Sequence, residues 1–83
     1  ETEVSASVYP NPAKERINVN TPNNTTVINS IALTDIQGKE IVNRNVNSTS
    51  VNETFEISNL AAGVYYLVFR TEGGNYTHKV IVN

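Results

Sequence analysis

The feature that most constrains this chain is an alternation of apolar and polar residues that returns about every ten residues. It recurs in VSASVY, RINVN, TTVINSIALTD (where it changes face at Asn29 or Ser30), KEIVNRNV, ETFEIS, GVYYLVFRT and NYTHKVIVN. Successive side chains of a strand point to opposite faces, so this period indicates half-buried strands, and no segment has helical spacing. The pattern predicts an all-β fold, a seven-stranded antiparallel Ig-like β-sandwich of Greek-key type.

The size of the chain allows one small core. With 83 residues, 39% of them hydrophobic, two Phe and no Trp or Met, its stability is expected to come from β-branched and aromatic residues on sheet faces. We predict a single domain over residues 1–83, with residues 1–3 as linker. Because the sequence contains no methionine, we expect it to be a piece of a longer protein.

Charge and cysteine content exclude several classes of partner. The net charge is -2 and the six Lys and Arg residues are scattered, so no basic stripe is present for nucleic acid or an anionic membrane surface. No cysteine is available for a disulfide or a thiolate metal site. No apolar run approaches the roughly 18 residues of a membrane helix, which predicts no membrane insertion.

The ingredients of a catalytic site are few, and we predict that the domain is not an enzyme and needs no cofactor. The chain has one histidine, His78, and one aspartate, Asp35, while Glu53 and Glu56 fall on opposite faces of one predicted strand. Neither a cluster of histidines nor a carboxylate loop typical of metal sites is present. A calcium ion held partly by backbone carbonyls is left open.

The last predicted hairpin allows a register argument. A turn centred on Gly73 and Gly74, both able to adopt positive φ, places Lys79 opposite Val68. One face then collects Tyr65, Leu67 and Phe69 opposite Val82, Val80 and His78, and the other collects Tyr66, Val68 and Arg70 opposite Ile81, Lys79 and Thr77. The first face is the predicted core. The second is either the half-solvated outside of a sheet or a docking patch.

Two prolines in VYPNPAKER break the pattern between the first two strands. Pro10 and Pro12 fix their own φ and donate no N–H, so the segment cannot be a central strand and the first strand should end at about Tyr9. Gly38 is expected to supply positive φ in a turn, and Gly63 to do so, or to permit close approach, at the entry to the GVYYLVFRT strand.

In this order, these features resemble the C-terminal sorting domain of type IX secretion substrates, type A (Por secretion system C-terminal sorting domain). The similarity covers Tyr9 to Asn83. Its motifs match Pro10, Asn11 and Pro12; Asp35, Gly38 and Lys39; Leu60, Gly63 and Tyr65 as L-x-x-G-x-Y; and Lys79 shortly before Asn83. L-x-x-G-x-Y also looks like the start of a late strand in Greek-key sandwiches, where the Tyr hydroxyl bonds back across a corner.

The resemblance implies a module that is not an enzyme and that travels behind a fused cargo protein. It implies export to the periplasm, recognition by an outer-membrane translocon and its sortase-like peptidase, and delivery to the cell surface of a Gram-negative bacterium. That peptidase usually cuts upstream of the folded module, here near or before Glu1, and attaches the cargo to an anionic lipopolysaccharide. Weak self-association is left open.

Combining the register with the resemblance gives a docking hypothesis: an outer-face patch together with the edge of the last strand, which places the docking residues at Tyr66, Val68, Lys79, Ile81, Val82 and Asn83. One alternative is an Ig-like or fibronectin-like accessory module that acts as a spacer or binds carbohydrate through Tyr9, Tyr66 and Tyr76. A more distant one is a small hydrolase using His78 and Asp35.

Overall fold

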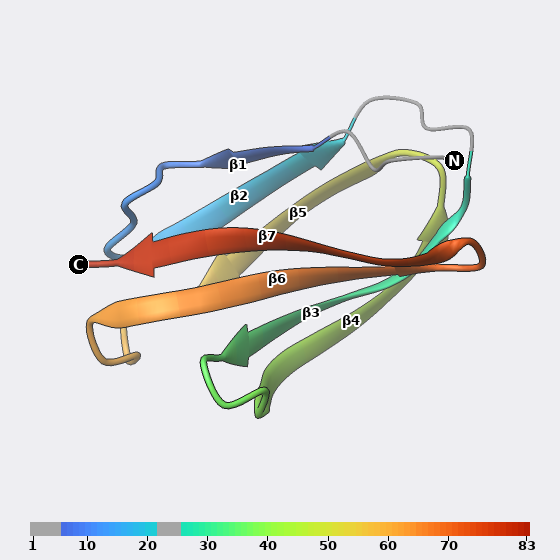
Figure 1. Ribbon diagram of the computed structural model, residues 1–83. Coiled ribbons are helices and arrows are strands. Elements are labelled where there is room, and N and C mark those ends of the chain that lie inside the picture. The colour runs from blue at the N-terminus through green and yellow to red at the C-terminus, as the bar shows by residue number, and fades with distance from the viewer. Residues whose placement is uncertain (1–5, 22–25) are drawn as a thin grey trace.

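The chain folds into two antiparallel sheets that pack face to face (Figure 1). The computed structural model describes residues 6–21 and 26–83, so the predicted linker and Val4 of the first predicted strand lie outside the described residues. The strands are β1 (Ser7–Tyr9), β2 (Arg16–Thr21), β3 (Ile28–Asp35), β4 (Glu40–Ser48), β5 (Val51–Glu56), β6 (Gly63–Thr71) and β7 (Gly74–Val82). One sheet has the order β1-β2-β5 and the other β4-β3-β6-β7.

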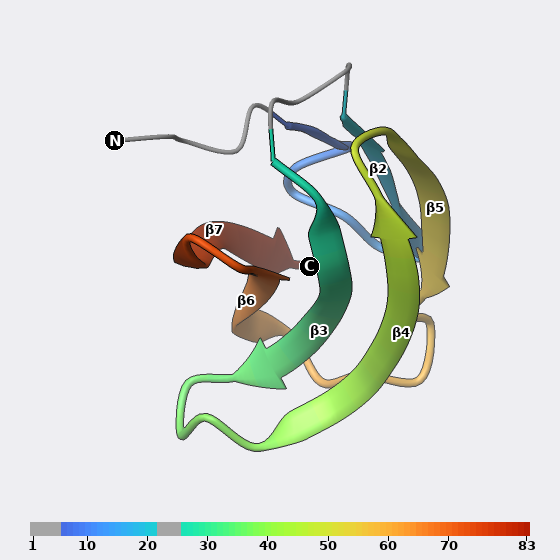
Figure 2. The same cartoon turned by 90° about the vertical axis from the view of Figure 1, so that its right-hand side faces the viewer.

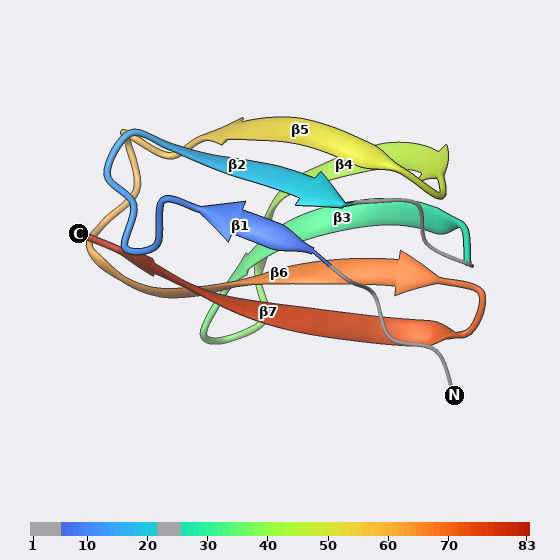
Figure 3. The same ribbon diagram turned by 90° about the horizontal axis from the view of Figure 1, so that it is seen from above.

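The chain passes between the sheets from β2 to β3, from β4 to β5 and from β5 to β6 (Figures 2 and 3). Consecutive strands pair in the hairpins β1–β2, β3–β4 and β6–β7, while β2 pairs with β5 and β3 with β6, the kind of non-consecutive pairing that Greek-key sandwiches also contain. The predicted all-β sandwich with seven strands is confirmed.

The core lies between the sheets and follows the alternation in the sequence. Along β6, Tyr65, Leu67 and Phe69 are buried while the residues between them are half-buried. The facing sheet contributes Ile17 and Phe55. The predicted core face of β6 is thus confirmed, and His78 in β7 is half-buried at its margin.

The central strand β3 is buried on both faces. Its register with β4 and β6 shifts between Ile28 and Ser30, which is the face change predicted at Asn29 or Ser30. Ala32 is completely buried between Asn43 of β4 and Val68 of β6, and the neighbouring strands also carry an ion pair of 3.1 Å between Arg70 and Glu40.

The β6–β7 hairpin differs from the predicted register by two residues. Gly74 pairs with Thr71, so Lys79 lies opposite Tyr66 and not Val68. The Thr71 hydroxyl determines this turn, since it accepts a hydrogen bond from the Gly73 N–H (3.1 Å) and donates one to the Gly74 carbonyl (2.7 Å). Because the shift is even, each side chain keeps its predicted face.

The side of the sandwich formed by β4 and β5 is closed by Arg44. Its Nη1 lies 2.9 Å from Oε1 of Glu53 and donates a 2.7 Å hydrogen bond to the Thr54 carbonyl. Its guanidinium carbon also lies 4.6 Å from the ring centre of Phe55. One side chain thus joins the edges of both sheets by charge, hydrogen bonding and a cation–π contact.

Candidate functional site

The end of the last strand is held by the proline segment. Residues 10–13, which we call the strap, leave β1 and reach the C-terminal end of β7, as Figures 1 and 3 show. The sequence-predicted break is confirmed, because β1 ends at Tyr9. The sequence predicts where the strand ends, but not the contacts that the strap makes with β7.

Asn11 contacts β7 through its side chain. Its Nδ2 donates a hydrogen bond to the Lys79 carbonyl (3.2 Å), and its Oδ1 accepts one from the Ile81 N–H (3.1 Å). The amide therefore presents one donor and one acceptor to the edge of the strand, as a neighbouring strand would.

Ala13 continues this contact through its backbone. Its N–H donates to the Ile81 carbonyl, its carbonyl accepts from the Asn83 N–H, both at 2.8 Å, and it forms a parallel bridge with Val82. The Ala13 side chain is completely buried in the core. Sequence reasoning missed Ala13, because a single small residue in a proline-rich link carries no periodic signal.

Proline suits the positions that flank Asn11. Neither Pro10 nor Pro12 has an N–H that would need a partner, so the strap can pass over the edge of β7 while Asn11 and Ala13 bond to it. Both proline peptide bonds are cis. The rings of Pro10 and Pro12 are exposed.

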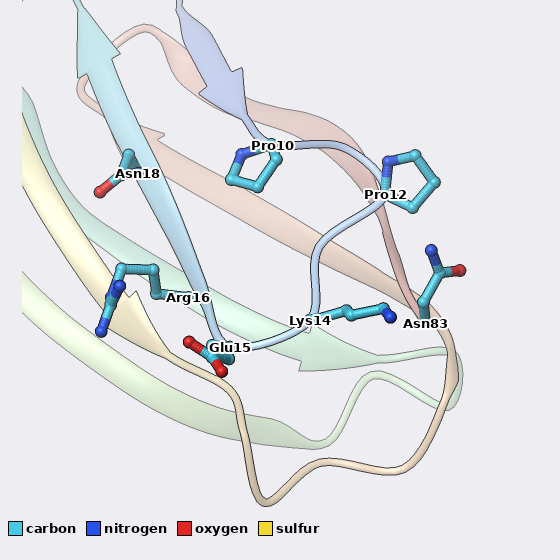
Figure 4. A pocket seen from close by; sticks show the side chains of 7 residues that line it. All are labelled: Pro10, Pro12, Lys14, Glu15, Arg16, Asn18 and Asn83. Atoms are coloured by element: carbon cyan, nitrogen blue, oxygen red, sulfur yellow. The ribbon is translucent and has the colours of Figure 1, made fainter.

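An open cleft of about 480 Å³ lies beside the strap (Figure 4). Beside two prolines it has basic, acidic and amide side chains, so its lining does not favour a ligand of one particular charge. It is lined by Pro10, Pro12, Lys14, Glu15, Arg16, Asn18 and Asn83.

The outer face of β6 and β7 carries the predicted docking patch, which we call the outer patch: Tyr66, Val68, Lys79 and Ile81. Tyr66 and Val68 are half-buried, Lys79 is exposed, and Ile81 is 38% exposed. The corrected register brings Tyr66 and Lys79 directly opposite each other, and Ile81 faces Val64.

Two residues predicted for docking lie differently. Val82 is 2% exposed and belongs to the core, since its side chain points to the opposite face from Ile81. The Asn83 side chain is exposed, but its N–H is bonded to Ala13. The terminal edge predicted as a docking surface is therefore occupied by the strap from Lys79 to Asn83.

The motif residues Asp35, Gly38 and Lys39 form the turn between β3 and β4. Oδ1 of Asp35 accepts hydrogen bonds from the N–H groups of Gln37 and Lys39, both at 2.9 Å. Gly38 has φ 87°, as predicted. These contacts are all within the turn, so this motif shapes the fold and leaves only the exposed Lys39 side chain toward solvent.

The L-x-x-G-x-Y motif forms the corner before β6. The Tyr65 hydroxyl donates a 2.6 Å hydrogen bond to the Ala61 carbonyl, which is the corner contact expected from the sequence. Gly63 opens the strand with φ 154°, and Leu60 packs against the core. This motif, too, is structural.

The histidine and the aspartate do not form a catalytic pair. Asp35 lies in β3 and His78 in β7, with β6 between them, so their strands are two spacings or about 10 Å apart. Within residues 6–21 and 26–83, no three His, Asp or Glu side chains gather where a metal ion could bind.

The three tyrosines proposed for a carbohydrate platform lie on different surfaces. Tyr66 is on the outer face of its sheet, whereas Tyr76 pairs with the buried Phe69 and packs against the core. Tyr9 is 50% exposed on β1 of the other sheet. They share no plane against which a sugar ring could stack.

Comparison with known proteins identifies a family that the chain matches over most of its length. The model of the family described as secretion system C-terminal sorting domain matches residues 7–83. No curated protein matches the chain. Among the described residues, no helix has the length and apolarity needed to cross a membrane.

Proposed function

Because the chain belongs to the family of secretion system C-terminal sorting domains, we propose that it is recognised by the outer-membrane type IX translocon and by its sortase-like peptidase. The family indicates a type IX secretion sorting signal, and such a signal implies export to the cell surface or the extracellular space. It is not a family of enzymes. The match over residues 7–83 is the observation that carries the proposal.

The outer patch is the surface that best fits recognition by a protein. It combines an exposed cation, Lys79, with the ring of Tyr66 directly opposite and with the exposed aliphatic side chain of Ile81. Aromatic and aliphatic groups beside one charge are typical of residues that contribute most to protein interfaces.

The strap supports this proposal because it holds the outer patch in one conformation. Asn11 holds β7 at Lys79 and Ile81, which are the two residues of β7 in the outer patch. A preorganised surface loses less conformational entropy when it binds. The domain thus contributes a rigid shape, and the translocon and the peptidase perform the transport and the cleavage of the fused cargo.

The experiment is a surface-display assay in a bacterium that has a type IX system. Residues 1–83 are fused behind a periplasmic reporter, and surface reporter is measured by antibody labelling of intact cells. We expect the unmodified fusion to reach the surface, and Lys79→Ala and Tyr66→Ser to lower display by about tenfold, the effect of losing ~1.4 kcal/mol of binding free energy.

Lys14→Ala is the matched control, because Lys14 is an exposed lysine outside the outer patch. It should display the reporter like the unmodified fusion. If the unmodified fusion stays in the periplasm, the sorting function is wrong. If it is displayed and both patch variants are displayed equally well while folded, the sorting function stands and the outer patch is wrong.

A further inference from the structure

Four strands end the two sheets, and three of them are short, irregular or partly covered, which hinders pairing with another chain. The end strands are β1 and β5 in one sheet and β4 and β7 in the other. Exposed edges carry unpaired N–H and C=O groups that can template a further strand, so proteins usually shorten, bend or cover them.

The protection differs from strand to strand. β1 has three residues and is followed by Pro10. On β5, the Thr54 carbonyl is covered by Arg44. β4 has two register shifts against β3, and Asn47 within it has φ 48°, which bends its edge.

β7 is protected over only part of its length. Asn11 and Ala13 bond to backbone groups of Lys79, Ile81 and Asn83, which shows that the odd-numbered residues of β7 direct their backbone outward. By the alternation of an antiparallel ladder, the N–H and C=O of Asn75 and Thr77 and the N–H of Lys79 point outward too. Nothing among the described residues pairs with these groups through its backbone.

This open half of the edge is also regular. β7 pairs with β6 over nine residues without a register shift, and it contains no proline. From Asn75 to Lys79 the edge therefore has the properties that favour strand addition. The strap marks where an added strand must stop.

We propose that the edge of β7 from Asn75 to Lys79 accepts an extended segment of a protein partner as an additional strand, with a carboxylate of that segment beside Lys79. A residue opposite Lys79 on the new strand would project from the outer face, next to the exposed ammonium group. Lys79 forms no ion pair with any described residue. The inference rests on the proposed function, for which it names the mode of recognition.

Hydrogen exchange measured by NMR on the isolated 83-residue chain is the first experiment. The amides of Thr77 and Lys79 should exchange fast, and those of Ile81 and Asn83 slowly. Protection of the Thr77 amide in the isolated chain would show that the edge is already covered, and would overturn the proposal.

The probe for binding is a synthetic peptide of alternating valine and threonine with one central glutamate. It should protect the Thr77 and Lys79 amides and bind about tenfold more tightly than the same peptide with a central lysine, the difference expected for one well-placed charge pair. In the Lys79→Glu variant the preference should invert. Absence of protection, or the same preference in both chains, contradicts the proposal.

Thr77→Pro tests the edge in the display assay. The Thr77 N–H points away from β6, so proline removes no bond of the β6–β7 ladder and blocks only the added strand. The matched control is Ile36→Pro, because Ile36 is exposed at the second position of the Asp35–Gly38 turn, where proline is favoured.

Display should fall about tenfold for Thr77→Pro and stay unchanged for Ile36→Pro. Normal display of a folded Thr77→Pro fusion overturns the edge proposal and leaves the sorting function standing, whereas failure of the unmodified fusion refutes the sorting function itself. If Thr77→Pro does not fold, the peptide experiment on the unmodified chain decides.

Discussion

On one side of the sandwich a single guanidinium joins the two sheets, whereas on the other side a length of backbone and an amide side chain do so. Arg44 bridges β4 and β5, which are consecutive in sequence, and its partners lie 9 and 10 residues away. The strap joins the end of β1 to β7, and the partners of Asn11 lie 68 and 70 residues away.

The difference separates two ways of closing a small sandwich. The Arg44 contact is electrostatic and partly exposed, so salt should weaken it. The strap consists of neutral hydrogen bonds beside the buried Ala13, and it holds the strand that carries Lys79 and Ile81. We therefore expect the strap side to determine both stability and recognition, and the Arg44 side to affect stability only.

The largest effect is expected for Asn11→Ala. It removes two hydrogen bonds to the backbone of β7, which should lower the free energy of unfolding by about 2 kcal/mol and the melting temperature by about 10 °C. Thermal unfolding followed by circular dichroism measures the shift. The Ile81 amide should also lose its protection from hydrogen exchange.

Asn11→Asp is the matched variant for the strap. A carboxylate still accepts the hydrogen bond from the Ile81 N–H, but it cannot donate to the Lys79 carbonyl. Its second oxygen would face the Lys79 carbonyl oxygen and repel it, so we expect Asn11→Asp to be destabilised by at least as much as Asn11→Ala. If both variants have the melting temperature of the original chain, the strap does not hold β7, and the contrast between the two sides disappears.

The second effect, of intermediate size, is expected for Arg44→Met, which keeps much of the length of the side chain but removes its charge. Loss of the contacts with Glu53, the Thr54 carbonyl and the Phe55 ring should cost roughly 1 kcal/mol, or about 4–8 °C in melting temperature. The difference in melting temperature between the variant and the original chain should be smaller at about 1 M NaCl than at low salt. Equal salt dependence would contradict an electrostatic closure.

Much of the fold was predictable because strand faces follow from local alternation. The buried Tyr65, Leu67 and Phe69 lie where period two places them. The hairpin register was wrong because two glycines suggested the centre of the turn, while the Thr71 hydroxyl formed the competing turn one residue earlier. A side chain that bonds to its own turn can thus override glycine placement.

The contacts of the strap could not be predicted from any local pattern. Proline chemistry indicates where β1 ends, but it does not indicate that the Asn11 amide reaches the backbone of β7. The same limit applies to docking: alternation placed Lys79 and Ile81 on the outer face, but the covered edge at Val82 and Asn83 depends on a contact with Ala13 from the other end of the chain.

The smallest effect is expected for the ion pair between Arg70 and Glu40 on the outer face, which joins strands of one sheet and closes neither side. Both side chains are about two fifths exposed, at 38% and 41%, so water and salt screen their attraction. A double-mutant cycle of Arg70→Gln and Glu40→Gln, measured by urea unfolding, should give a coupling free energy of about 0.2–0.5 kcal/mol. A coupling as large as the whole Arg44→Met effect would mean that exposed charge pairs in general stabilise this sandwich. In that case the charge of Arg44 alone would account for its contribution to the free energy of unfolding, and its position between the two sheets would contribute nothing further.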